Sequence, residues 1–278
     1  MAEDLLLLGG SGRLGGFLRA AAPGILAPGH RDLDPLALGE EALRAAIAGS
    51  RGVLNCAAMA DVDACERSPT AAFRANAELP GRLAAACADL GLPLVHVSTD
   101  YVFGGRPGPF DEGAERCPVQ AYGRSKAEGE RRVLAGGGTV VRISWLFGPG
   151  IPAFARFVAA QLPSGCVRVH EGQRSRPTWG PALAAWLLAL ARLRADGDEA
   201  PSILHPTGGP PASRAEWAQA LLASWGRSES VVEGKPGPEQ APRPRDSTLD
   251  GRSTADWAAR AGLPALPDWR ERLSGMGE

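Results

Sequence analysis

The 278-residue chain carries 30 basic and 31 acidic residues, so its net charge is close to zero. This balance gives no sign of a nucleic-acid partner or of an anionic membrane surface. The longest apolar run near the start, residues 5–8, is too short to span a bilayer and lacks the flanks of a signal peptide. The five scattered cysteines never form a C-x-x-C pair, which favours a reduced cytoplasmic protein over a zinc or disulfide scaffold.

The first half of the chain predicts strands that alternate with helices. In chain order these are a strand at 4–10 that ends in glycine, a helix at 13–22, a strand at 24–30, a helix at 38–49, a strand at 52–58, a helical stretch at 69–91, a strand at 92–99, a helix at 121–137 and a strand at 138–148. Continuous apolar strands between helices are typical of a parallel sheet covered on both faces. We therefore expect an α/β fold of the Rossmann type, with a doubly wound parallel sheet.

After about residue 148 the regular alternation weakens. Helices are predicted at 154–162, 181–193 and 215–225, between loops rich in proline and glycine. Residues 226–247 are polar and proline-rich and are expected to form an extended surface segment. We expect a dinucleotide-binding domain at 1–148, with segments near 166–196 returning to it, and a smaller, mostly substrate-binding lobe at 149–278.

The sequence LLLLGGSGRLGG contains a glycine loop directly after the first strand. Gly9, Gly12 and Gly15 follow the pattern G-x-x-G-x-x-G and lead into a helix. Glycines permit a tight turn, and the backbone amides near Arg13 and Leu14 can then hold a pyrophosphate at the helix N-terminus. This position in an α/β pattern predicts a dinucleotide site.

The end of the second strand should lie near the adenosine ribose, where an acidic residue favours NAD and an arginine favours NADP. Arg31 comes first and favours NADP, while Asp34 is expected to reach the adenine, so NAD stays open. After the third strand, Asn55, Ala57 and Ala58 supply small residues where the dinucleotide crosses the edge of the sheet.

Tyr122 and Lys126 lie four positions apart and therefore on one face of a helix. The chain has only two tyrosines and two lysines, so a lysine at 126 stands out against a basic set that is almost all arginine. Just upstream, a strand ends at Ser98 and Thr99, at the same edge of the sheet as the glycine loop. Together these residues predict a catalytic site.

The chemistry explains why a lysine is needed. A phenol has a pKa of about 10, which is too high for a good proton donor near neutrality. A cation at about 4 Å favours the phenolate by about 4 kcal/mol, or about three pKa units. Lys126 would thus bring the pKa of Tyr122 near neutrality and also bind the cofactor ribose, which the broad fork of arginine does not do equally well. Thr99 would orient a substrate carbonyl and stabilise charge on its oxygen, while Ser98 contacts the cofactor.

These motifs together resemble those of the extended short-chain dehydrogenases/reductases, and most closely the dTDP-4-dehydrorhamnose reductase family. The resemblance covers nearly the whole chain and includes NCAAMADVDACE at 55–66, STDYVFGG at 98–105, YGRSK at 122–126, VRISW at 141–145, GQRSRPTWGPALA at 172–184, LHPTGG at 204–209 and APRPRDSTLD at 241–250. It implies hydride transfer from NADPH or NADH to the C4 ketone of a nucleotide-linked 6-deoxyhexose. It also implies a catalytic set of Thr99, Tyr122 and Lys126, with substrate contacts from Tyr101, Trp145 and Arg243.

The chain departs from the family pattern in two places. Met59 and Ala60 stand where the family has an aromatic residue and a threonine, and Gly172 stands where it has an acidic residue. These departures leave open a ketoreductase acting on another sugar or metabolite. A non-catalytic regulator similar to the β subunit of methionine adenosyltransferase also stays open, as does a homodimer. No metal site is assigned.

Overall fold

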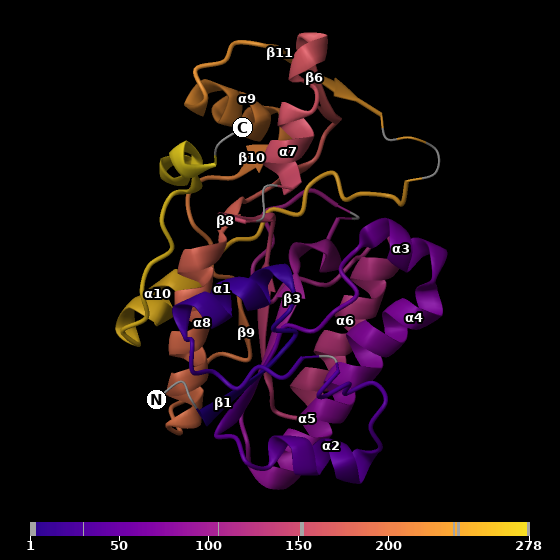
Figure 1. The fold of residues 1–278 in the computed structure, drawn as a ribbon, viewed down its shortest axis with the longest axis vertical. Helices are drawn as coiled ribbons and strands as arrows, with labels where there is room; N and C mark the ends of the chain where they lie inside the picture. Colours follow the sequence, from indigo (N-terminus) through magenta and orange to yellow (C-terminus); the bar gives the residue numbers. More distant parts are fainter. Residues whose placement is uncertain are drawn as a thin grey trace.

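The computed structural model describes residues 4–29, 31–104, 106–150, 153–235, 237 and 240–276. A five-stranded parallel sheet forms the centre of the lower part of the molecule (Figure 1). Its strands, in spatial order, are β1 (Leu5–Leu8), β2 (Gly52–Asn55), β3 (Leu94–Thr99), β4 (Thr139–Ile143) and β9 (Ile203–Leu204). Every residue of β1, β2 and β3 is buried, as expected for strands covered on both faces.

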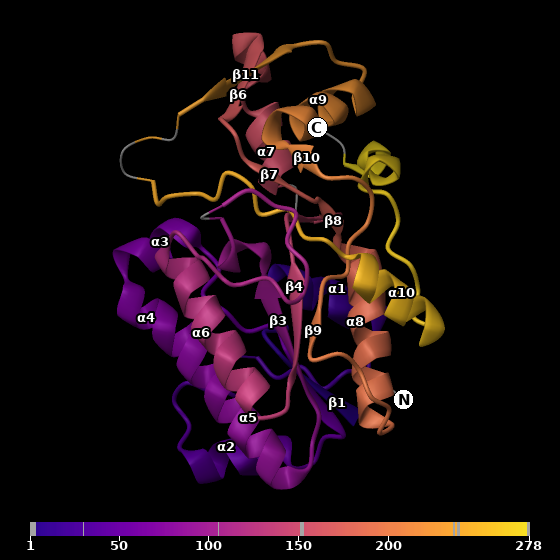
Figure 2. The same cartoon turned by 180° about the vertical axis from the view of Figure 1, so that it is seen from behind.

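Helices cover both faces of the sheet, which makes the fold a doubly wound α/β fold of the Rossmann type (Figures 1 and 2). On one face, the core is shared by α1 (Arg13–Ala21), α8 (Gly180–Ala195) and α10 (Arg252–Arg260). On the other face it is shared by α2 (Glu40–Ile47), α5 (Leu79–Leu90) and α6 (Ala121–Ala135). Two short helices, α3 (Val62–Arg67) and α4 (Pro69–Phe73), lie beside α6.

In the first half of the chain, two predicted elements differ from the structure. The strand expected at 24–30 is reduced to a single bridge between Leu26 and Leu6, with only two backbone hydrogen bonds to β1; His30 lies outside the described residues. The long helical stretch at 69–91 is split by a π-helical turn over Arg74–Glu78 between α4 and α5. Such wide turns are often found at functional sites.

A second hydrophobic cluster, rich in aromatic side chains, forms the core of the upper lobe. Its elements are α7 (Ala153–Ala159), β6 (Cys166–His170), α9 (Arg214–Ser224) and a 3₁₀ segment at Trp269–Gly275. Short strand pairs complete it: β5 (Leu146–Phe147) with β8 (Thr178–Trp179), and β7 (Arg174–Ser175) with β10 (Ala212–Ser213). Among the described residues, no helix is both long and apolar enough to cross a membrane.

The proline-rich stretch at 226–247 was expected to be extended surface chain, but part of it is a strand. β11 (Ser230–Gly234) pairs in parallel with β6. Further along, the Ala241 amide donates to the Asp63 carboxylate of α3, and the Ser247 hydroxyl donates to Asp100 beside β3. This stretch therefore ties the upper lobe to the sheet domain.

Candidate active site

The glycine loop joins β1 to α1, and close backbone approach explains its glycines. Gly9 has a φ of +82°, and a Cβ there would lie 2.6 Å from the Ala57 nitrogen. A Cβ at Gly15 would lie 2.2 Å from the Gly9 carbonyl oxygen. Because no side chain fits at either position, the first turn of α1 stays open to a ligand, and this end of the helix favours an anion.

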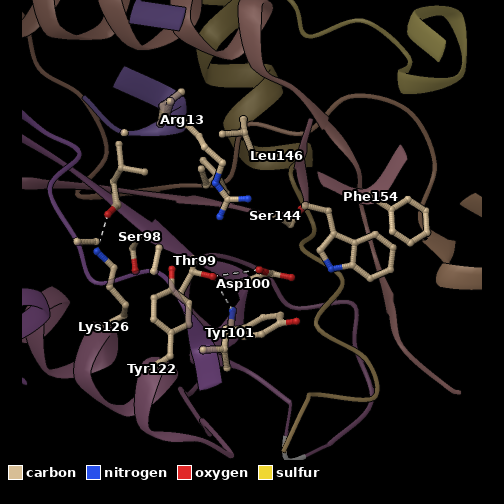
Figure 3. Close-up of a pocket in the computed structure, with 18 of the residues that line it drawn as sticks. Arg13, Ser98, Thr99, Asp100, Tyr101, Tyr122, Lys126, Ser144, Leu146 and Phe154 are labelled. Carbon is tan, nitrogen blue, oxygen red and sulfur yellow. Dashed lines mark hydrogen bonds between the residues drawn. The ribbon is translucent and has the colours of Figure 1, made fainter. Parts of the chain in front are cut away.

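A cavity of about 520 Å³ begins at this loop and extends between the sheet and the upper lobe. On the sheet side, Figure 3 shows Thr99, Tyr122 and Lys126 together, with Arg13 reaching in from the opposite wall. The cavity brings together most of the predicted site residues, namely Gly9, Gly12, Arg13, Leu14, Gly15, Ala58, Ser98, Thr99, Tyr101, Tyr122, Lys126, Trp145 and Arg243.

Tyr122 and Lys126 come from the first turns of α6, which begins at Ala121. The Ala121 amide is held by the carboxylate of Glu66 on α3, which fixes the start of the helix. Lys126 is only 1% exposed, and its Nζ lies 2.7 Å from the Val97 carbonyl oxygen and 3.0 Å from Nε2 of His96. The lysine is thus anchored to β3 beneath the cavity.

The electrostatics of this pair differ from the expectation. Burial raises the pKa of Tyr122 well above its usual value; a hydrogen bond with Thr99 opposes this rise, and the nearby Asp100 carboxylate adds to it. Burial also lowers the pKa of Lys126 to about 8. The expected lowering of the Tyr122 pKa towards neutrality is therefore wrong for this arrangement, because the lysine amine is directed at β3 and desolvation of the phenolate dominates.

The carboxyl end of β3 supplies Ser98 and Thr99. The Thr99 hydroxyl donates to Asp100 at 3.1 Å and accepts from the Tyr101 amide at 3.1 Å, so its position is fixed (Figure 3). Asp100 in turn accepts hydrogen bonds from Ser175 and Ser247, and burial raises its pKa to about 6. Ser98 lines the cavity, but its hydroxyl donates to the buried Glu130 at 2.6 Å.

Aromatic side chains and an arginine form the upper wall of the cavity. Trp145 has a φ of +34° and is the one residue other than glycine with positive φ in the part of the chain that the structure describes. The guanidinium of Arg214 lies 3.8 Å above its ring, and Arg214 Nε donates to Gln173 at 3.3 Å. Tyr101 packs edge-on against Tyr122, with ring centres 6.1 Å apart. A strained backbone beside a buried cation is typical of a ligand site.

Arg214 was not predicted from the sequence. It is the first residue of α9, whose start is fixed by a capping box between Ser213 and Glu216. The only available signal was this S-x-x-E pattern, which predicts a helix start and says nothing of a cavity. Arg243 also lines the cavity and pairs with Asp63 at 2.9 Å, so two arginines face the upper half of the space.

Four predicted cofactor residues lie outside the cavity wall. Arg31 is exposed, and Asp34 uses its carboxylate to accept from the Leu36 amide at 3.0 Å. Asn55 is fully buried and hydrogen-bonds to the Ala57 amide and to the ring of His96. Asn55 therefore holds the Ala57 backbone in place, and Ala57 packs against Gly9 of the glycine loop.

The two departures from the family pattern fall in different surroundings. Ala60 lines the cavity, whereas Met59 packs on the same small apolar cluster as Tyr122. The Met59 backbone N–H donates to the side-chain amide of the buried Asn76 in the π-helical turn, and its carbonyl accepts from that amide. Gly172 has a φ of +68° and lies beside the side chain of Arg245. Of these positions, residue 60 changes the shape of the cavity directly.

Known proteins with similar sequences are named as reductases of dTDP-linked sugars. The chain is 36% identical to the dTDP-4-dehydrorhamnose reductase of Mycolicibacterium smegmatis, over 98% of this chain and 84% of the relative. It is 32% identical to the dTDP-4-keto-6-deoxy-D-glucose reductase of Streptomyces niveus, over 99% of this chain and 96% of the relative. Among solved structures, the dTDP-4-dehydrorhamnose reductase of Bacillus anthracis in complex with NADP matches with a TM-score of 0.84 and 25% identity, over 99% of each chain.

The family match is as broad as these pairwise alignments. The model of the RmlD substrate binding domain matches residues 3–277, which include the glycine loop, the end of β3, α6 and the upper lobe. The resemblance to this family inferred from the motifs is therefore confirmed. This chain belongs to the family described as the RmlD substrate binding domain.

Proposed function

We propose that the protein is a reductase that uses NADPH to reduce the C4 ketone of a dTDP-linked 4-keto-6-deoxy sugar. The observation that carries this proposal is one cavity that holds the glycine loop together with Thr99, Tyr122 and Lys126. Relatives that match nearly the whole chain bear the names of such reductases, and the Bacillus anthracis structure contains NADP.

The glycine loop fits a dinucleotide. The backbone between Gly9 and Gly15 has no room for a Cβ at either end, so it forms a cradle for a pyrophosphate at the start of α1. Arg13 lines the same space and offers a positive charge to the phosphates. When bound, the reduced nicotinamide supplies a hydride to the ketone carbon.

The residues of this chain supply the proton and hold the carbonyl. A phenol with a raised pKa is fully protonated at neutral pH, so Tyr122 is available as a proton donor. The alkoxide that forms on the sugar is a stronger base than a phenolate, and it takes the Tyr122 proton. Thr99, which Asp100 and the Tyr101 amide hold in place, orients the carbonyl oxygen. Lys126 positions the ribose and adds positive charge beneath the reacting groups.

The upper half of the cavity fits a nucleoside diphosphate. Arg214 and Arg243 are two cations facing a space that the sheet closes from below. A diphosphate carries two negative charges, and each arginine can bind an oxygen pair through its planar fork. Phe154 and Phe157 also line the cavity, with ring centres 6.0 Å apart, and offer apolar surface for a base.

The direct test mixes the protein, NADPH and a dTDP-4-keto-6-deoxy sugar, and follows the loss of the absorbance of the reduced nicotinamide. We expect oxidation that depends on the sugar, with a product reduced at C4. A UDP-linked ketosugar and NADH serve as controls for nucleotide and cofactor preference. Tight NADPH binding without oxidation by any ketosugar would contradict the proposal and favour a non-catalytic regulator.

The remaining assignments follow from this function. We infer a boundary between the cofactor-binding and substrate-binding parts near residue 148, with α8 and β9 returning to the sheet. A nucleotide sugar is the proposed small-molecule partner. A cytoplasmic location and a homodimer stay predictions.

A further inference from the structure

Three polar side chains form a buried chain beneath the cavity. Asn55 at the end of β2, His96 on β3 and Lys126 on α6 are each 0–1% exposed. Asn55 Nδ2 lies 3.0 Å from His96 Nδ1, and Lys126 Nζ lies 3.0 Å from His96 Nε2. The imidazole therefore stands between an amide and an amine that both carry hydrogens.

The orientation of the Asn55 amide is fixed by its other contact. Its Oδ1 accepts a hydrogen bond from the Ala57 backbone amide at 3.1 Å, so Nδ2 must face the ring. A backbone N–H cannot donate to an NH₂ group, and a turned amide would leave this buried N–H without its partner. Because Nδ2 can only donate, His96 Nδ1 must be the unprotonated nitrogen of the ring.

This arrangement decides what His96 presents to Lys126. A neutral imidazole has one hydrogen, which then lies on Nε2 and points at the lysine. An ammonium has only hydrogens to offer and would repel that N–H, whereas an uncharged amine can accept it and still donate to the Val97 carbonyl at 2.7 Å. All the contacts are satisfied together when Lys126 is an uncharged amine.

We propose that His96 is a positioning residue for Lys126, and that the tautomer of its ring is coupled to the protonation state of the lysine. In the amine form the ring hydrogen is on Nε2 and Asn55 donates to Nδ1. In the ammonium form the pair holds one more proton, taken up from solvent: the lysine has three hydrogens and the ring hydrogen is on Nδ1. The Asn55 amide must then turn its oxygen to the ring, and this form gives up the hydrogen bond from the Ala57 amide that the amine form keeps. The consequence for turnover rests on the proposed function.

The surroundings place this exchange near neutral pH. Burial lowers the pKa of Lys126 to about 8, and the titratable groups that oppose the effect are Glu130, one turn along α6, and Cys56 after β2. Glu130 is already paired with Arg142 at 2.8 Å, and burial raises the pKa of Cys56 to about 12. Burial and Lys126 both hold the pKa of His96 well below its usual value, so the ring stays neutral.

Nitrogen NMR on histidine-labelled wild-type protein tests the coupling without any assay of turnover. The chain has four histidines, and a His96→Gln sample identifies the signals of His96. We expect the ring to be protonated on Nε2 above a pH of about 8 and on Nδ1 below it. A single tautomer across the whole range from pH 6 to 10, or an ordinary imidazole titration, would overturn the proposal.

A second measurement uses the pH dependence of kcat/KM. We expect the wild type to lose activity as the pH rises through about 8, since the ammonium is lost. In His96→Gln a neutral carbonyl can accept from the ammonium without moving a proton, so this limit should shift up by about one pH unit. His205→Gln, which removes another fully buried histidine, should leave the limit unchanged.

The two measurements separate the inference from the function. If the pH limit of kcat/KM is unchanged in His96→Gln and NMR shows one fixed tautomer, the coupling is contradicted. The proposed reductase function is not affected by that result. A tautomer exchange near pH 8 in a protein that oxidises NADPH with no ketosugar would support the coupling and reject the proposed function.

Discussion

Lys126 and Val97 join α6 to β3, with 2.7 Å between the lysine nitrogen and the backbone carbonyl oxygen. This contact lies one helical turn from Tyr122, the proposed proton donor, so it holds this part of α6 against the strand that carries Thr99. The residues of the proposed reductase site therefore lie on two neighbouring elements, α6 and β3. Single substitutions in these elements can test their roles.

Replacing Lys126 by arginine should weaken both cofactor binding and turnover. The planar guanidinium cannot occupy the space of a compact amine between His96 and Val97, and it stays charged at every accessible pH. We expect the Kd for NADPH to rise and kcat to fall, each by about tenfold or more. Lys235→Arg, at an exposed position, is the matched control and should change neither. Unchanged values in Lys126→Arg would show that the shape of the lysine is not required.

Replacing Gly15 by alanine should impair the dinucleotide site. The new Cβ would overlap the Gly9 carbonyl oxygen at 2.2 Å, so the loop must shift away from its present path. We expect the affinity for NADPH, measured by fluorescence titration, to fall by about tenfold or more. Gly16→Ala is the matched control, because nothing lies within 4 Å of its Cβ, and it should keep the affinity. Equal affinities in the two variants would argue against a pyrophosphate at this loop.

Replacing Arg214 by glutamine should act on the sugar nucleotide more than on the cofactor. The variant removes the cation that lies over Trp145 in the upper half of the cavity. We expect the KM for the dTDP-sugar to rise by about tenfold to a hundredfold with little change in the Kd for NADPH. Arg131→Gln, on the exposed side of α6, removes only a surface ion pair and should behave as wild type. A larger effect on NADPH than on the sugar would place the diphosphate elsewhere.

The buried amine should also shape stability at alkaline pH. The pKa of Lys126 is lowered from 10.5 to about 8 in the folded protein, so the unfolded chain binds this proton more tightly. Between these values the free energy of unfolding should rise with pH, by up to about 3 kcal/mol in total. We expect the difference in unfolding free energy between wild type and Lys126→Met, from urea titrations, to move in favour of wild type over this window. A difference that stays constant with pH would mean that the folded-state pKa is not lowered.

Much of the site could be predicted because its signals are local. The spacing of Gly9, Gly12 and Gly15, and the four-residue step from Tyr122 to Lys126, are set by one turn and one helix. Parallel strands then bring their carboxyl ends to one edge, which adds Thr99. The family pattern also covers these stretches.

Other features depend on contacts between distant segments. Arg214 is one arginine among many, and only the docking of α9 over Trp145 brings it to the cavity. The strand at Ser230–Gly234 has no buried residue and lies in a polar, proline-rich stretch, so its pairing with β6 decides its structure. The pKa expected for Tyr122 from its sequence neighbours is wrong, because the cost of burying a phenolate depends on the packing around the ring and outweighs the effect of a nearby amine.

The most direct test of the account is the Tyr122→Phe variant, assayed by single-turnover oxidation of bound NADPH with the dTDP-ketosugar. The variant keeps the ring, which packs against Tyr101, and loses only the hydroxyl that we propose as the proton donor. We predict a rate about 10² to 10⁴ times lower than that of wild type, with the Kd for NADPH nearly unchanged. A rate close to that of wild type would contradict the assignment of Tyr122 as the proton donor.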